Sequence, residues 1–285
     1  MRLLNNWDSF RKSSLRRVIV WHLRALQLLY KKRPVPLSYW LSLRSAVQQI
    51  SHGPDPLSPP RDFYMSNGAS LPVHELRELL RDEPLGQWAL DGGTISFLWE
   101  GLQQDQPTVV MECGAGVSTL VLAKSLTHNR FGSKNSVFVF SIEQDVRAKE
   151  TTERRLESWD LKTHVEILHA PTSKQGDYQL DGAIVKECLG SKKVDWLVID
   201  GPAGPEGCRA STLPSLARFC RPGTRRFLDD AFRDGELQIL NQWDRLRGIV
   251  VDGIYPLGKG LGAGIVTDPQ QVAETRVISA SVRQS

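Results

Sequence analysis

The sequence predicts an α/β fold in which a doubly wound, mostly parallel sheet of seven strands is closed by an antiparallel hairpin, with a helical appendage at the amino terminus. First, an apolar run at 109–111 leads through a glycine turn into an apolar helix, as expected of a strand covered on both faces. Second, further apolar runs ending in acids alternate with helical stretches. Third, the apolar runs 248–255 and 262–268 are separated by a glycine-rich link, which is typical of a hairpin.

The amino-terminal segment, residues 1–33, is strongly basic. It contains nine Lys or Arg and one Asp, a charge of +8, so that the rest of the chain carries −4 within a total of +4. Its apolar residues favour a helix, but Arg24 interrupts them too early for a membrane span of about 20 apolar residues. No cleavage site typical of a signal peptide follows. We expect a helix that lies on an anionic membrane surface, or that docks on its own domain or on a second subunit as in a homodimer.

Six prolines between residues 34 and 60 mark a connector that follows this arm. The predicted division is a helical arm and connector at 1–61, a catalytic domain at 62–270 and a tail at 271–285. Helices are expected at 37–50, at 72–81 and from a cap near Thr94. Because the chain outside the arm is net negative, we expect no nucleic-acid partner.

The cysteines and histidines show no metal-binding pattern. The four cysteines lack C-x-x-C spacing and the six histidines form no cluster, so we expect neither a zinc site nor a disulfide framework. A reducing cytoplasm is the simplest compartment, with membrane association through the arm as the alternative.

The stretch 108–124 is the one around which the chain is organised. Gly114 and Gly116, on either side of Ala115, allow unusual backbone angles and leave room for a ligand to approach the main chain. Ser118 and Thr119 can cap the following helix, whose positive dipole end suits an anion or a carboxylate.

An acidic residue followed by Gly-x-Gly, here Glu112, Gly114 and Gly116, resembles motif I of the class I methyltransferases that use S-adenosylmethionine (SAM) and have a Rossmann-like fold. A nicotinamide fingerprint would require a third glycine where Thr119 stands. The resemblance implies that the cofactor lies against the turn and the helix start. The candidate cofactor-binding residues are Glu112, Gly114, Ala115, Gly116, Ser118 and Thr119. A strand, turn and helix with no ligand is the alternative.

The second predicted strand, 136–143, ends in Glu143, and a polar amphipathic helix is expected at 145–159. The resemblance places at Glu143 the carboxylate that accepts hydrogen bonds from both ribose hydroxyls of SAM. An ionised carboxylate suits this role because it offers two acceptor oxygens and no donor. A third strand is expected at 164–170.

The fourth and fifth predicted strands also end in acids. Asp200 closes the run 194–200, and Asp229 and Asp230 close 226–230, after a helix at 208–220 and a turn at Pro222-Gly223. Neighbouring strands in this fold would bring the three carboxylates to one edge, where oxygen ligands suit Mg²⁺. The pattern resembles metal-dependent O-methyltransferases of the catechol and macrocin types. The alternative is an aspartate–arginine network that includes Arg233.

These observations predict a SAM-dependent methyltransferase that acts on an oxygen of a small molecule or sugar. Asp200 or Asp230 is the candidate general base if no metal activates the acceptor. An Asn-Pro-Pro-Tyr-like motif of amino-methylating enzymes is absent near residue 200. Alternatives are methylation of a protein or lipid at a membrane surface, a NAD-dependent oxidoreductase, or a scaffold that keeps the fold without catalysis.

Overall fold

The computed structural model describes residues 17–30, 33–50, 57–59, 71, 73–81, 83, 85–86, 89–128 and 138–282. The helices are an amino-terminal helix (17–30), α2 (Leu37–Ile50), α4 (His74–Leu79), α5 (Gly92–Asp105), α6 (Val117–His128), α7 (Val146–Ser158), α8 (Gly182–Leu189), α9 (Thr212–Leu216), α10 (Asp234–Trp243) and α11 (Pro269–Val282). The strands are β1 (Val109–Cys113), β2 (Phe138–Glu143), β3 (Val165–His169), β4 (Val194–Ile199), β5 (Cys220–Leu228), β6 (Ile249–Tyr255) and β7 (Leu261–Val266).

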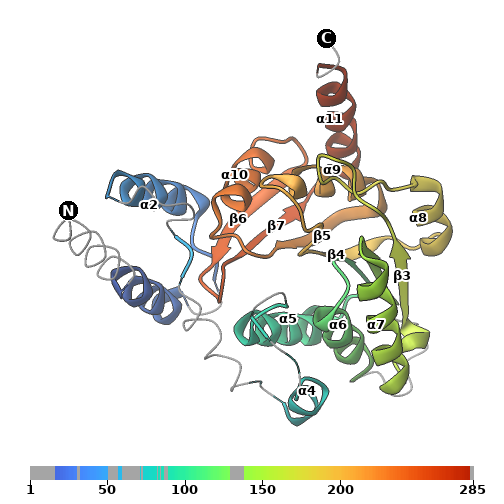
Figure 1. Cartoon of the computed structure of the whole chain (residues 1–285). Helices are drawn as coiled ribbons and strands as arrows, with labels where there is room; N and C mark the ends of the chain where they lie inside the picture. Colours follow the sequence, from blue (N-terminus) through green and yellow to red (C-terminus); the bar gives the residue numbers. More distant parts are fainter. Residues whose placement is uncertain are drawn as a thin grey trace, which may run out of the picture.

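The seven strands form one sheet in the order β3-β2-β1-β4-β5-β7-β6. Figure 1 labels β6, β7, β5, β4 and β3 from left to right across this sheet. β1 pairs in parallel with β2 and β4, whereas β7 runs antiparallel to both β5 and β6. The predicted fold class, with its closing antiparallel hairpin, is confirmed. A dinucleotide-binding sheet has the order 3-2-1-4-5-6 and lacks the strand that here, as β7, lies between β5 and β6.

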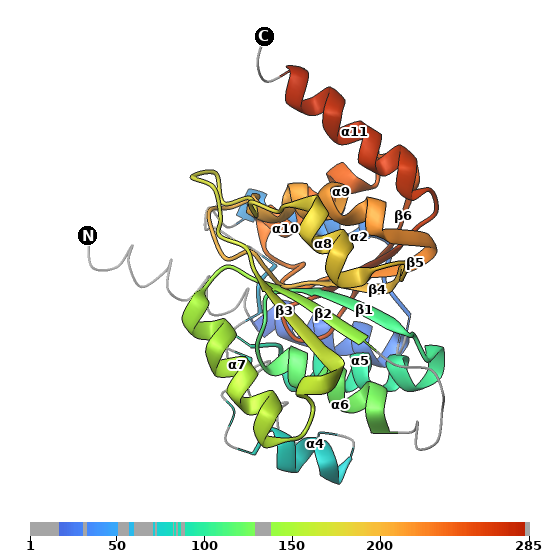
Figure 2. The same cartoon turned by 90° about the vertical axis from the view of Figure 1, so that its right-hand side faces the viewer.

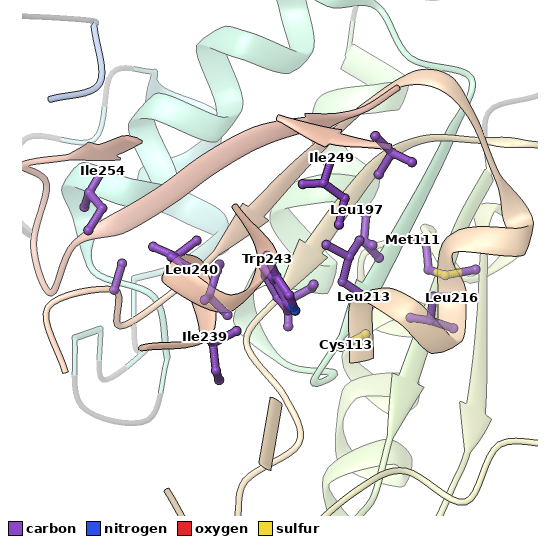
Figure 3. Packing of buried hydrophobic residues seen from close by; sticks show 14 of the residues in the cluster. Met111, Cys113, Leu197, Leu213, Leu216, Ile239, Leu240, Trp243, Ile249 and Ile254 are labelled. Carbon is purple, nitrogen blue, oxygen red and sulfur yellow. The ribbon is translucent and has the colours of Figure 1, made fainter. Parts of the chain in front are cut away.

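Helices cover both faces of the sheet (Figure 2). α4 to α7 lie on one side, where their apolar residues pack with Val110, Val139 and Trp196. α8 to α10 lie on the other side, with Met111 and Leu197 in the same apolar cluster (Figure 3). Successive residues of β1 therefore contribute to opposite cores, which explains why its sequence is apolar without alternation.

The predicted helix at 208–220 is confirmed in part: residues 208–219 are helical, but α9 is short and is flanked by two 3-10 turns, Cys208–Ser211 and Ala217–Phe219. Pro214 has no N–H to bond the carbonyl of Ala210. That carbonyl instead accepts a hydrogen bond of 3.0 Å from Trp243 Nε1. The side chain from α10 thus satisfies a backbone group that a continuous helix would have used.

Two local expectations also change. Pro222 and Gly223 lie inside β5, where the pairing with β4 shifts between Val194 and Trp196, so the expected turn is an irregularity within the strand. The cap of α5 is Asp91, whose carboxylate accepts from the N–H groups of Gly93 and Thr94, and not Thr94 itself. Aspartate suits a cap because its short side chain reaches the free N–H groups.

The described part of the arm is docked on the domain. Ile19, Leu23 and Leu26 of the amino-terminal helix are buried in the cluster that contains Trp40 of α2. Val35 exchanges backbone hydrogen bonds of 2.9 Å with Ile254 of β6. The expected division at residue 62 lies outside the described residues, and the division at 271 falls within α11, where Val272 is buried. Among the helices described, none is long and apolar enough to cross a bilayer.

Candidate active site

The glycine turn after β1 lies against the end of β4. Gly114 has a φ of +95°, and a Cβ added there would lie 3.2 Å from the backbone nitrogen of Gly201. Gly116 differs, because no described heavy atom outside Gly116 and its two chain neighbours lies within 4 Å of a Cβ built on it. The turn is therefore closed on its Gly114 side and open beside Gly116, where it lines a cavity.

Glu112 and Thr119 stabilise this turn through hydrogen bonds on the side that does not line the cavity. The Thr119 hydroxyl donates to Oε2 of Glu112 at 2.6 Å and accepts from the Gly116 N–H at 2.9 Å, and the Ser141 hydroxyl also donates to Oε2 of Glu112 at 3.0 Å. Burial raises the pKa of Glu112 to about 7, against hydrogen bonds from Ser118, Thr119 and Ser141 that lower it. Neither Glu112 nor Thr119 is among the cavity-lining residues. The structure thus places these two candidates where they position the turn, without direct access to a cofactor.

Glu143, at the end of β2, does line the cavity. Its Oε2 accepts from the Ala115 N–H at 2.7 Å, and its Oε1 accepts from the Asp145 N–H at 2.8 Å. Burial raises the pKa of this carboxyl group, while the backbone hydrogen bonds lower it. Each carboxylate oxygen can accept more than one hydrogen bond, so both retain acceptor capacity toward the cavity.

The cavity has a volume of about 1030 Å³. It lies at the carboxyl ends of β1, β2 and β4, the edge where open α/β sheets bind ligands. Its size suffices for a nucleoside-sized cofactor together with a second small molecule. Its lining includes the predicted residues Gly114, Ala115, Gly116, Ser118, Glu143, Asp200 and Asp230.

The three predicted aspartates converge beyond the ends of β4 and β5. Carboxylate oxygens of Asp200, Asp229 and Asp230 lie within 4.8 Å of one another. β5 ends at Leu228, and Asp230 has a φ of +60°, so both aspartates have left the alternating geometry of the strand and can face the same point. Asp229 is 1% and Asp230 2% exposed, whereas Asp200 is more open to the cavity.

Three cationic side chains surround these carboxylates. Lys259 Nζ lies 2.7 Å from Oδ1 of Asp230 and 3.2 Å from Oδ2 of Asp229. The buried Arg209 guanidinium lies 3.4 Å from Asp200 and 3.6 Å from Asp230, and Arg233 lies 3.0 Å from Asp230. The aspartate–arginine network weighed from the sequence is present, with a lysine that the sequence did not reveal.

This environment separates the pKa values of the aspartates. Burial raises the pKa of Asp200 above its usual value and that of Asp229 to about 8. For Asp230, burial is outweighed by Lys259, Arg209 and Arg233, and the pKa is lowered. Burial opposes the charge of Lys259, but Asp229 and Asp230 raise its pKa, so it stays an ammonium ion at neutral pH.

The donor set does not fit a divalent cation while Lys259 is in place. An ion coordinated by Asp229 and Asp230 would lie close to the ammonium group that already contacts both. Like charges about 4 Å apart repel by about 4 kcal/mol per pair of unit charges at an effective dielectric constant of about 20. The Mg²⁺ expected from the sequence would therefore have to displace the Lys259 ammonium group in order to bind these carboxylates.

Comparison with solved structures identifies the fold. The O-methyltransferase TomG from Streptomyces achromogenes, involved in tomaymycin synthesis and solved with SAM, is 15% identical with a TM-score of 0.52, covering 73% of this chain and 99% of its own. An O-methyltransferase from Bacillus cereus solved with SAH is 16% identical with a TM-score of 0.50, covering 81% and 99%. SAH-bound methyltransferase PaMTH1 from Podospora anserina is 10% identical with a TM-score of 0.51, covering 80% and 94%.

At these identities the comparison shows that the chain shares the fold of these three methyltransferases. No protein-family model matches the sequence, and no match was found among the curated proteins.

Proposed function

We propose that this protein is a SAM-dependent methyltransferase that transfers a methyl group to an oxygen of a small molecule or sugar. The observation that carries this proposal is the open space beside Gly116, in the same cavity as Glu143 and Asp200. A site for this reaction needs a backbone cradle, a ribose acceptor and a proton acceptor, and these three residues supply one of each.

The residues that line the cavity fit the cofactor. Gly116 leaves room for it against the main chain, Glu143 has free acceptor capacity for the ribose hydroxyls, and Ser118 lies at the positive end of α6 near its carboxylate. Ala115, which donates its N–H to Glu143, fixes the carboxylate relative to the turn. Bound SAM supplies an electrophilic methyl group on a sulfonium, which an oxygen nucleophile can attack in line.

Asp200 is the proposed general base. It lines the cavity, and its raised pKa makes it a better proton acceptor than Asp230, whose pKa is lowered by three cations. With SAM bound, Asp200 would accept the proton of the acceptor hydroxyl as that oxygen is methylated. Arg209, 3.4 Å from Asp200, holds the carboxylate in place.

The Lys259 ammonium group occupies the position beside Asp229 and Asp230 where the sequence predicted a metal ion. Lys259 compensates the charge of Asp230 and also contacts Asp229, and it lines the cavity. Its ammonium group can donate a hydrogen bond to the acceptor oxygen and orient it toward Asp200. Asp230 in this account positions Lys259.

The test is a screen in which the purified protein is incubated with SAM and a set of hydroxyl-bearing compounds, and release of S-adenosylhomocysteine is measured. Turnover with a hydroxyl compound, lost in Asp200→Asn, supports the proposal. SAM binding without turnover on any acceptor would favour a scaffold, and binding of NADH in place of SAM would favour an oxidoreductase. Turnover only on proteins or lipids would move the acceptor to that class.

A further inference from the structure

The amino-terminal helix has two apolar sides, and among the described residues one of these sides is packed against the fold. Ile19, Leu23 and Leu26 are buried against α2 and the sheet. Gln27 Nε2 donates a hydrogen bond of 2.6 Å to the carbonyl of Pro256, which follows β6. The helix is thus held in a fixed orientation on the domain.

The opposite side presents large apolar residues to solvent. Val18 is 60%, Trp21 69%, Leu28 76% and Leu29 77% exposed. Their positions i, i+3, i+10 and i+11 lie on one side of a helix with about 3.6 residues per turn. Among described residues, the other exposed large apolar side chains reach at most 47% and are scattered over other elements. A group of this kind on one helix marks an interaction surface.

Basic residues border this surface. Arg17 and Arg24 are exposed and lie at the edge of the same side of the helix, next to Trp21 and Leu28. The segment 1–33 to which they belong carries +8 in sequence, whereas the rest of the chain carries −4. Apolar and aromatic residues flanked by arginines are the composition of helices that lie in the plane of an anionic bilayer.

We propose that the exposed side of the amino-terminal helix binds an anionic membrane surface. The four exposed apolar side chains enter the headgroup region, and Arg17 and Arg24 contact lipid phosphates. Each exposed arginine near an anionic surface strengthens binding about fivefold. The inference does not depend on the methyltransferase reaction.

A second copy of the chain suits this surface less well. A two-fold contact would bring the same patch of both copies together, and with it two segments of +8. A stable interface also needs about 800 Å² per partner, more than four side chains on one helix provide. Charge favours the lipid surface and opposes self-association.

The test is co-sedimentation of the full chain with vesicles of phosphatidylcholine, with and without phosphatidylserine. We expect binding only to the phosphatidylserine vesicles, weakened by added salt. The double variant Trp21→Ala/Leu28→Ala should bind at least about tenfold more weakly. Arg17→Gln and Arg24→Gln should each weaken binding about fivefold.

The matched control is Trp159→Ala/Ile184→Ala, which removes two exposed apolar residues, one at the end of α7 and one on α8. This variant should bind as the original chain does.

Because the changed side chains are mostly exposed, thermal unfolding of all variants should match the original chain. Absence of binding to phosphatidylserine vesicles, or equal binding by Trp21→Ala/Leu28→Ala and its control, would overturn the proposal. So would a dimer in analytical ultracentrifugation that dissociates in Trp21→Ala/Leu28→Ala, since a second copy would then cover this surface.

Discussion

Lys259 Nζ lies 2.7 Å from Oδ1 of Asp230, at the place where the sequence suggested a metal ion. The lysine is carried there by the connection between β6 and β7, which returns the chain to the end of β5. An internal ammonium group thus compensates a buried acidic pair from within the chain.

Replacing this ammonium should expose the metal-binding capacity of the cluster. We expect Lys259→Met to destabilise the fold by about 3–5 kcal/mol, because it removes one partner of the buried Lys259–Asp230 ion pair. We also expect Mg²⁺ to raise the melting temperature of this variant but not that of the original chain. Differential scanning fluorimetry with MgCl2 or EDTA provides the measurement, and the exposed Lys174→Met is the control. A melting temperature of the original chain that rises with Mg²⁺ and falls with EDTA would show that a metal binds despite Lys259.

Glu112 predicts a specific pH dependence of stability. Its pKa is about 7 in the folded chain against 4.5 for an ordinary glutamate, so the folded state retains a proton that the unfolded state loses. Stability from this group is therefore full below about pH 4.5 and falls as pH rises to about 7, by about 3 kcal/mol in all. Glu112→Gln should remove this part of the dependence. Urea unfolding at intervals from pH 4.5 to 8 measures it, and parallel curves for the variant and the original chain would contradict the assigned pKa.

Asp200 and Asp230 should differ in function although they are neighbours. Once an acceptor is known, Asp200→Asn should lower kcat by about 10²–10⁴-fold with little change in SAM affinity, because it removes the proton acceptor. Asp230→Asn should act mainly on stability and on KM for the acceptor, since it loosens Lys259. Steady-state kinetics with unfolding curves distinguish the two, and equal effects on kcat would contradict separate roles.

The sequence predicted the fold better than the contacts within the site. The strand at 109–113 and the strand end at Glu143 could be predicted, because an apolar run and the turn after it depend on adjacent residues. Lys259 was missed because it reaches the aspartates from a loop distant in sequence, and Arg209 was missed because nothing local shows that the 3-10 turn Cys208–Ser211 brings its side chain back to Asp200. For Lys259 the only signal was its place between Gly258 and Gly260, and Arg209 had none.

Predictions from local sequence also differ from the structure where contacts between distant segments decide the geometry. Within the expected helix at 208–220, Pro214 has no N–H for the Ala210 carbonyl, which accepts a hydrogen bond from Trp243 of α10 instead. Glu112 was expected beside the cofactor because of the motif resemblance. The motif gives the position of Glu112 along the strand, but it does not show which way the carboxylate faces. In the structure it faces Thr119 and Ser141, away from the cavity.

Glu143 should contribute to cofactor affinity through its ribose hydrogen bonds. We expect Glu143→Ala to weaken SAM binding by about 1.5–3 kcal/mol, about tenfold or more, as is usual for hydrogen bonds to a charged group. Isothermal titration calorimetry measures this, and Glu166→Ala on β3, which changes an exposed glutamate, is the control. If the affinity of Glu143→Ala equals that of the control, the ribose does not lie at Glu143.

Gly116 permits the most direct test of the cofactor site. No described heavy atom outside Gly116 and its two chain neighbours lies within 4 Å of a Cβ at this position, so Gly116→Val should fold with a melting temperature close to that of the original chain. Its side chain would occupy the space assigned to the cofactor. We predict that calorimetry shows SAM binding to the original chain and no measurable SAM binding to folded Gly116→Val; equal SAM affinities for the two proteins would contradict the assignment of this cavity to SAM.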